Sequence, residues 1–255
     1  MEKDNLKPIY NDTFQKRSKP KKSHRHRNIL ITLLISLILI GGGSYFWYVH
    51  KSSSISSYQV RGAMITQDDG YVDFQQLQDS RIKFVYLKAT SGASYKDDQF
   101  ENNYNRVSGS DVQVGIYHDF SFTTSAKEQY EYIVSQIKKE SGTLPIVVHV
   151  TYYQGKTPNT DTQGKKLARL LKMLANHYDQ DCIVWASPSI QKQMVDPFVT
   201  KSKRMLTSDK LHSKRSDVKF IQYVGKDKLR INRKSSNLLP AVFNGNTKEW
   251  KSYSK

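Results

Sequence analysis

Several side chains that can do acid–base chemistry stand at or soon after short apolar runs. Asp119 follows His118 near the end of "VQVGIYHDF", Asp68 and Asp69 follow "QVRGAMIT", and His149 lies within "PIVVHVT". A carboxyl or imidazole group within hydrogen-bond reach of a substrate can act as a general acid or base. Two carboxyl groups that flank a glycosidic bond can hydrolyse it. Asp119 with Asp68 or Asp69 is therefore one candidate carboxylate pair.

Each of these groups also has a structural interpretation. Asp68 and Asp69 precede Gly70, as turn residues often do. We expect His118 to be a hydrogen-bonded residue at a strand end. His149 is either a polar residue lining a groove, a general acid, or a metal ligand together with His118 and Asp119. The chain has no Cys-x-x-Cys or His-Glu-x-x-His spacing and no Gly-rich phosphate loop, so we predict neither a metal site nor a cofactor.

The elements that must position these groups alternate between apolar runs and amphipathic stretches. The apolar runs predict strands at 59–66, 82–90, 112–120, 145–150, 182–187 and 219–224. The amphipathic stretches predict helices at 72–80, 95–107, 125–140 and 162–178. This alternation predicts an α/β fold with a parallel sheet, and about seven strands favour a closed barrel over an open sheet. In such a barrel the reactive groups lie at the carboxyl ends of the strands.

The N-terminal part predicts a membrane anchor. Residues 29–49 pass without a charge, long enough to span a bilayer as one helix, and no cleavage site follows them. Residues 1–28 form a basic tail that cannot bury a core, and residues 50–57 a Ser-rich linker. The positive flank places the N-terminus in the cytoplasm and the domain at 58–255 outside the cell.

The charge of the chain indicates which classes of molecule it binds. The formal net charge of +17 predicts attraction to a polyanion, and the run Lys201–Arg215 concentrates much of that charge on what we expect to be one loop or helix surface. An ordinary solvated surface is the alternative. The outside location argues against nucleic acid. The single cysteine, Cys182, forms no disulfide within the chain and is expected in the core.

The order of motifs over residues 58–250 carries a family resemblance. "GAMITQDDGYVDFQQL" is similar to "GVDVSxYQGxIDWxxV", "IKFVYLKATSGASYKDDQFENN" to "IKFAIIKATEGTSYxDPxFxxN", and "VQVGIYHDF" to "LKVGAYHF". "PIVVHVT" stands where "PLVLDVE" is expected, and "FIQYVG" and "LLPAVFNGN" match "WQY" and "VDLNxFNG". The chain thus resembles the glycoside hydrolase family 25 lysozymes, muramidases that cut the glycan of peptidoglycan. The resemblance implies a TIM-like (β/α) barrel with a groove at the strand ends.

The same resemblance shows that the family's acidic positions are substituted. They fall on Met64, His149, Thr151 and Leu239, and the Glu of "KATEG" corresponds to Ser91. Glycoside hydrolysis needs a general acid and a second, stabilising or nucleophilic group. Threonine, methionine and leucine supply neither, so we expect no intact catalytic site. Asp119, Asp68 and Asp69 remain the fallback catalytic candidates.

Aromatic residues near strand ends suggest a groove that binds sugar without cutting it. Flat rings can stack on sugar faces, although packing in the core is the alternative for each ring. These aromatic residues are Tyr117, Tyr152, Tyr153, Trp185 and Tyr223. The groove-lining candidates are Tyr117, His118, Asp119, His149, Thr151, Trp185 and Tyr223.

The sequence therefore predicts a membrane-anchored, lysozyme-like protein that binds or scaffolds peptidoglycan and is catalytically inactive. Its expected partners are peptidoglycan glycan, anionic wall polymers, the membrane through one helix, and proteins of the cell envelope. Two alternatives stay open. One is an active muramidase with displaced carboxylates, and the other is an interaction module whose groove is filled by its own side chains.

Overall fold

The computed structural model describes residues 25–50, 54–139, 141–152 and 158–254. The chain divides into two compact units, Met1–Ser52 and Ser53–Lys255. Helix α1 (Arg25–His50) contains a stretch, Asn28–Tyr45, that is long and apolar enough to cross a membrane. The predicted tail lies mostly outside the described residues, as do residues 51–53 of the predicted linker.

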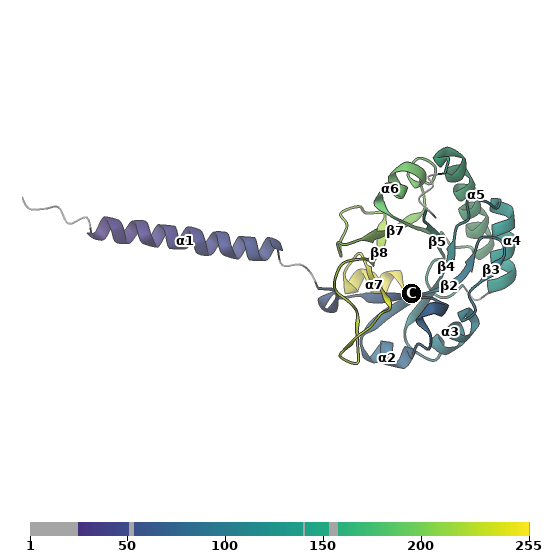
Figure 1. Cartoon of the computed structure of the whole chain (residues 1–255), viewed down its shortest axis with the longest axis horizontal. Helices are drawn as coiled ribbons and strands as arrows, with labels where there is room; N and C mark the ends of the chain where they lie inside the picture. The colour runs from purple at the N-terminus through teal and green to yellow at the C-terminus, as the bar shows by residue number, and fades with distance from the viewer. Residues whose placement is uncertain (1–24, 51–53, 140, 153–157, 255) are drawn as a thin grey trace, which may run out of the picture. The chain divides into compact units, whose positions relative to one another are not determined.

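The second unit is a closed barrel of eight strands, which confirms the predicted fold class (Figure 1). The strands are β1 (Arg61–Ile65), β2 (Ile82–Ser91), β4 (Gln113–Asp119), β5 (Val147–Val150), β6 (Ile183–Ala186), β7 (Lys203–Ser208), β8 (Val218–Tyr223) and β11 (Leu239–Phe243). Neighbours pair in parallel from β1 through β2 and β4 to β8, whereas β11 runs antiparallel to both β8 and β1. The carboxyl ends of seven strands therefore meet at one mouth of the barrel. Outside the barrel wall, β3 (Tyr95–Lys96) pairs antiparallel with the end of β2, and β9 (Arg230–Ile231) pairs antiparallel with β10 (Lys234–Ser235).

Helices cover the outside of the barrel (Figure 1). They are α2 (Phe74–Asp79), α3 (Phe100–Val107), α4 (Ala126–Ile137), α5 (Thr160–Tyr178) and α6 (Pro188–Ile190), with short helical turns η1 (Ile55–Ser57), η2 (Gln67–Asp69) and η3 (Gln191–Val195). Helix α7 (Thr247–Tyr253) instead closes the end of the barrel, where its Trp250 ring packs on Phe84 and Phe220 of the interior. Helix α4 starts where the Ser125 hydroxyl accepts from the Glu128 amide and the Glu128 carboxylate accepts from the Ser125 amide. Four leucines of α5, at positions 167, 170, 171 and 174, are buried against the wall, as their helical spacing predicts.

Aromatic rings fill the barrel interior. Phe84 and Tyr86 of β2 are fully buried, and both contact the ring of Phe220 edge-on at centroid distances of 5.1 and 5.5 Å. The space for these rings comes from glycines on the neighbouring strands. A Cβ atom on Gly62 would lie 2.4 Å from the Phe84 ring, and one on Gly115 would lie 2.4 Å from the Tyr86 ring. The interior is therefore a packed core, and a ligand has access only at the two ends.

Three sequence expectations differ from the structure. The basic run Lys201–Arg215 is not one solvated surface, because it contains strand β7, whose Arg204, Met205 and Leu206 are buried. Strand β11 was not among the predicted strands. The helix expected at 95–107 begins only at Phe100, because Tyr95 and Lys96 pair with the end of β2.

Candidate functional site

Three charged or polar side chains from neighbouring strands meet at the mouth of the barrel. Nζ of Lys88 on β2 lies 2.8 Å from Oδ2 of Asp119 on β4, and Nδ1 of His149 on β5 lies 2.8 Å from Oδ1 of the same carboxylate. Asp119 and His149 are register partners. Because side chains alternate along a strand, Lys88, Asp119 and His149 stand on the same inward side as Tyr86, Tyr117 and Val147 of the interior.

The two partners hold Asp119 in its ionised form. The Asp119 side chain is only 10% exposed, and this burial raises its pKa. The hydrogen bond and charge of His149, together with those of Lys88, outweigh burial, so the pKa of Asp119 lies below its usual range. An ionised carboxylate is an acceptor only, so His149 donates its Nδ1–H to Asp119. Asp119 therefore has no proton to give near neutral pH.

An aromatic residue covers one face of His149. The imidazole stacks on the Trp185 ring with a centroid distance of 3.7 Å and an angle of 25°, and Tyr117 contacts both rings edge-on. Trp185 donates its indole N–H to the Thr207 hydroxyl at 2.9 Å. With only 4% of its surface exposed, Trp185 has no free face for a sugar. His149, with 19% of its side chain exposed, is the residue of this stack that faces the mouth.

Two further positions that the resemblance assigns to acids are adjacent. Met64 on β1 and Leu239 on β11 are register partners. Met64 is fully buried in the interior core, whereas Leu239 is 47% exposed. This part of the mouth therefore presents a thioether and an isobutyl group at the two positions where the resemblance places carboxylates.

His118 lies on the other side of strand β4 and does not line the mouth. Its ring is fully buried, with Nε2 3.2 Å from Oε1 of Gln129 on α4 and Nδ1 2.8 Å from the hydroxyl of Thr90 on β2. Burial lowers the pKa of His118 to about 4, which keeps it neutral. The amide oxygen of Gln129 can only accept, so His118 donates from Nε2 and accepts at Nδ1. His118 braces helix α4 against the barrel wall.

The fallback carboxylates Asp68 and Asp69 belong to the turn η2 after β1. Oδ2 of Asp69 accepts from the Thr66 amide at 2.8 Å, and Asp68 is exposed. Burial raises the pKa of Asp69 more than the hydrogen bonds from Thr66 lower it. A third carboxylate, Asp97, is buried and accepts from the amides of Gln67 and Gln99. The carboxylates of Asp69 and Asp97 therefore hold the turn, and burial raises the pKa of both.

The remaining candidates differ in access to solvent. Thr151 and Tyr152 follow β5 and are half-buried. Tyr223 is mostly buried and packs in the layer between barrel and helices. Tyr153 lies outside the described residues. Of the predicted groove residues, the structure brings together Tyr117, Asp119, His149 and Trp185.

The residue that sequence reasoning missed is Lys88. The sequence contained a signal for it. Phe84, Tyr86 and Lys88 are spaced two residues apart along one strand, so their side chains must lie on the same face of that strand. Among the described residues, no group of three or more His, Cys, Asp or Glu side chains is placed to hold a metal ion. The mouth thus brings together a carboxylate, an ammonium group and a stacked imidazole.

Two characterised lysozymes are similar in sequence to parts of this chain. Lysozyme M1 of Streptomyces globisporus is 29% identical over 98 residues, which cover 36% of this chain and 33% of that protein. The autolytic lysozyme of Clostridium acetobutylicum is 32% identical over 59 residues, covering 23% of this chain and 18% of that protein. The matched part thus spans a third or less of these relatives.

Solved structures match over most of the chain. A family 25 glycosyl hydrolase from Bacillus anthracis superposes with a TM-score of 0.70 at 25% identity, covering 80% of this chain and 97% of that one. A lysozyme from Streptomyces coelicolor, 19% identical, shares the fold with a TM-score of 0.65 over 78% of this chain and 98% of that one. The sequence model described as "Glycosyl hydrolases family 25" matches residues 65–204, more than half of the chain. The chain therefore belongs to glycosyl hydrolase family 25.

Proposed function

We propose that this protein is a membrane-anchored member of the family that binds the glycan of peptidoglycan at the barrel mouth and does not hydrolyse it. Family membership and the lysozyme relatives support peptidoglycan as the ligand. The apolar helix α1 supports anchoring, with the barrel outside the cell. The net charge of +17 supports additional contact with anionic wall polymers.

The main support for a loss of hydrolysis is that both carboxylate oxygens of Asp119 are paired with other side chains. Oδ2 faces Lys88 and Oδ1 faces His149, each at 2.8 Å. A general acid must hold a proton at the working pH, and the lowered pKa of Asp119 prevents this. A nucleophile or stabilising anion needs uncompensated negative charge, and Lys88 compensates it.

The mouth retains groups that suit a polar ligand. Lys88, His149 and Thr151 are each partly exposed and carry hydrogen-bonding atoms. Ligand sites of this kind combine a few convergent polar groups with apolar walls, here the neighbouring Leu239 and the stacked rings beneath His149. Such a site can hold a sugar without a catalytic carboxylate.

One observation favours a second candidate function, an active muramidase with displaced carboxylates. The pKa of Asp69 is raised by burial, as a general acid requires. Asp119 would then be the stabilising anion. Against this, Asp69 is bound to the Thr66 amide and Asp119 is compensated by two partners.

The deciding experiment incubates the full chain in detergent with purified peptidoglycan and measures released reducing ends and co-sedimented protein in the same tube. We expect co-sedimentation without release above a heat-inactivated control. Release that is abolished in both Asp119→Asn and Asp69→Asn would establish the active alternative. If the folded chain neither sediments nor releases sugar, the mouth does not bind peptidoglycan and the proposal is wrong.

A further inference from the structure

A second concave site lies at the opposite end of the barrel from Asp119 and His149. Strand β8 begins there at Val218, and β11, which runs the other way, ends there at Phe243. The pocket between them has a volume of about 1000 Å³. Its lining comes from Tyr58 before β1, from residues 212–216, 218 and 219, from residues 243–246, and from helix α7.

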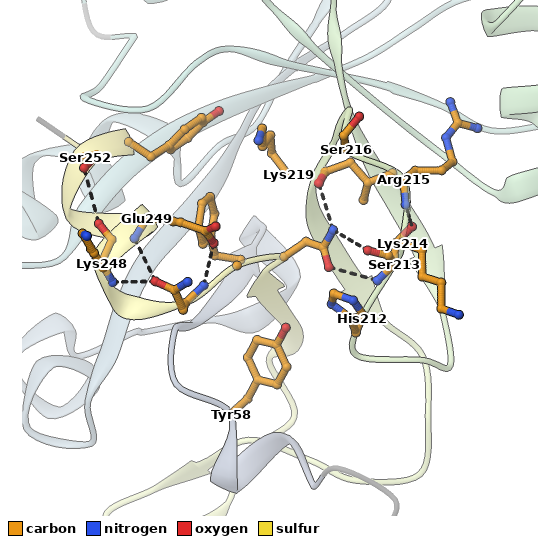
Figure 2. Close-up of a pocket in the computed structure, with 16 residues that line it drawn as sticks. Tyr58, His212, Ser213, Lys214, Arg215, Ser216, Lys219, Lys248, Glu249 and Ser252 are labelled. Carbon is orange, nitrogen blue, oxygen red and sulfur yellow. Dashed lines mark hydrogen bonds between the residues drawn. The ribbon is translucent and has the colours of Figure 1, made fainter. Parts of the chain in front are cut away.

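Hydrogen bonds hold the wall of this pocket in shape. The side chain of Asn244 donates to the carbonyl oxygens of Ser213 and Val218, both at 3.0 Å, and accepts from the Ser213 amide at 2.9 Å. Figure 2 shows these bonds joining the segment that carries His212 to Ser216 to the end of β11. The segment between β7 and β8 is therefore fixed to the barrel at the pocket, so the site is built before any ligand enters.

The pocket carries uncompensated positive charge. Lys214, Lys219 and Lys248 line it, and among the described residues none of their ammonium groups has an ion-pair partner. Arg215 differs, because its guanidinium is already bound to Asp196 and Asp217. The one carboxylate of the lining, Glu249, accepts from the Asn246 amide. Three lysines without an ion-pair partner among the described residues therefore line a pocket whose lining contains one carboxylate.

Between the two basic walls lie aromatic rings with hydroxyl groups. In Figure 2, Lys248 stands on helix α7 at one side and His212 to Ser216 at the other, with the Tyr58 ring pointing into the space between them. Tyr253 lines the pocket from α7. Burial raises the pKa of both Tyr58 and Tyr253, so their hydroxyls stay protonated and can donate. An organic group can therefore pack on the rings while an anion meets the lysines and hydroxyls.

We propose that this pocket binds the phosphate of a phosphorylated alcohol or sugar. Lysine ammonium groups bind phosphate as point charges with rotatable donors, and serine and tyrosine hydroxyls add neutral donors. The volume of about 1000 Å³ leaves room for an organic part beside the phosphate. The site is separate from the glycan-binding mouth and does not depend on it.

The test uses the full chain in phosphatidylcholine nanodiscs and isothermal titration with sn-glycerol 3-phosphate, with glycerol as the neutral comparison. The pocket variant is Lys219→Gln with Lys248→Gln, which removes one ammonium group from each wall. The matched control is Lys165→Gln with Lys172→Gln, two exposed lysines on α5 that lower the net charge equally. Melting temperatures establish that both variants are folded.

We expect the pocket variant to lose about tenfold or more in affinity for glycerol phosphate while the control stays within about twofold of the parent. Equal losses in the two variants would mean general charge attraction and would overturn the proposal. So would absence of binding to the parent chain at millimolar glycerol phosphate.

The phosphate can come from a lipid headgroup or from a water-soluble phosphate, and nanodiscs containing phosphatidylglycerol distinguish the two. The lipid source is tested because Tyr58 follows the last residue of α1 by only eight positions. If the headgroup fills the pocket, the parent chain binds glycerol phosphate more weakly in these discs and the pocket variant shows no such change. If affinity is unchanged, the ligand is a soluble phosphate. Both results support a phosphate site.

Discussion

Nδ1 of His149 lies 2.8 Å from Oδ1 of Asp119, and the two residues are register partners on neighbouring strands at the barrel mouth. The family resemblance places a carboxylate at position 149. This chain has a histidine there, which forms a hydrogen bond to the carboxylate of Asp119. With Lys88 on the other oxygen, Asp119 becomes the centre of a three-residue bridge across β2, β4 and β5. The mouth therefore contains charged and polar side chains, and Lys88, Asp119 and His149 bind to one another there.

Asp119→Asn should destabilise the barrel near neutral pH. The change removes the anion that faces the ammonium group of Lys88, which is only 22% exposed, so we expect the free energy of unfolding to fall by about 2 kcal/mol. Because the pKa of Asp119 is lower in the folded chain, its contribution is complete above about pH 4 and is lost as pH falls through the folded value. Urea titrations at neutral and acidic pH measure both effects. Asp209→Asn, at an exposed site, should change little. A variant as stable as its parent at neutral pH would contradict the bridge.

The buried, neutral His118 should make the free energy of unfolding depend on pH over a different range from Asp119. It titrates near 4 when folded and near 6.5 when unfolded, so between these values the unfolded chain binds the extra proton. Stability should therefore fall as pH drops through this window, by up to about 3 kcal/mol at full effect. In His118→Gln this part of the slope should disappear, which urea titrations between pH 7 and 4 will show. A slope that is identical in parent and variant would mean that His118 is not buried neutral.

His149→Asp with Thr151→Glu should restore some hydrolysis. The aspartate introduced at position 149 would lie beside Asp119, and two neighbouring carboxylates share a proton, which raises the pKa of one of them. The introduced glutamate adds a second acid to the mouth. We expect reducing-end release about 100-fold above the background of the heat-inactivated control at mildly acidic pH. Thr151→Glu alone is the control and should stay near the parent rate. If the folded double variant binds peptidoglycan and releases nothing, the Met64 and Leu239 positions are also essential.

The proposed topology can be tested with single cysteines. Cys182 is 2% exposed, and burial raises the pKa of its thiol to about 12, so the parent chain should react little with a maleimide. On intact cells that express the chain, a membrane-impermeant maleimide should label Ser189→Cys, an exposed barrel position, and not Ser18→Cys. Detergent should make both reactive. Labelling of residue 18 on intact cells would reverse the orientation.

The regular elements were predictable where burial makes the pattern simple. The parallel strands 82–91 and 113–119 are buried along most of their length, because the barrel interior covers one face and helices cover the other, and each contains a continuous or nearly continuous apolar run. Strand β7 was missed because lysines and arginines surround its buried Met205 and Leu206. Arg204 itself is buried, with its guanidinium bonded to the carbonyl oxygens of Val199 and Ser202. Those carbonyls lie two and five residues before Arg204, in the segment that leads into β7, and the residue types do not reveal that this segment turns its carbonyls onto the guanidinium.

The sequence by itself determined the family, the α/β barrel and the apolar N-terminal helix, because these depend on residue types and their order along the chain. The substitution of the family's acids by Met64, His149, Thr151 and Leu239 stays a prediction from the resemblance. Only the tertiary structure decided which side of a strand each group occupies and what it meets there. His118 and Asp119 are sequence neighbours, yet successive side chains point to opposite faces. His118 therefore braces a helix, and Asp119 joins Lys88 and His149, which lie 31 and 30 residues away in the chain.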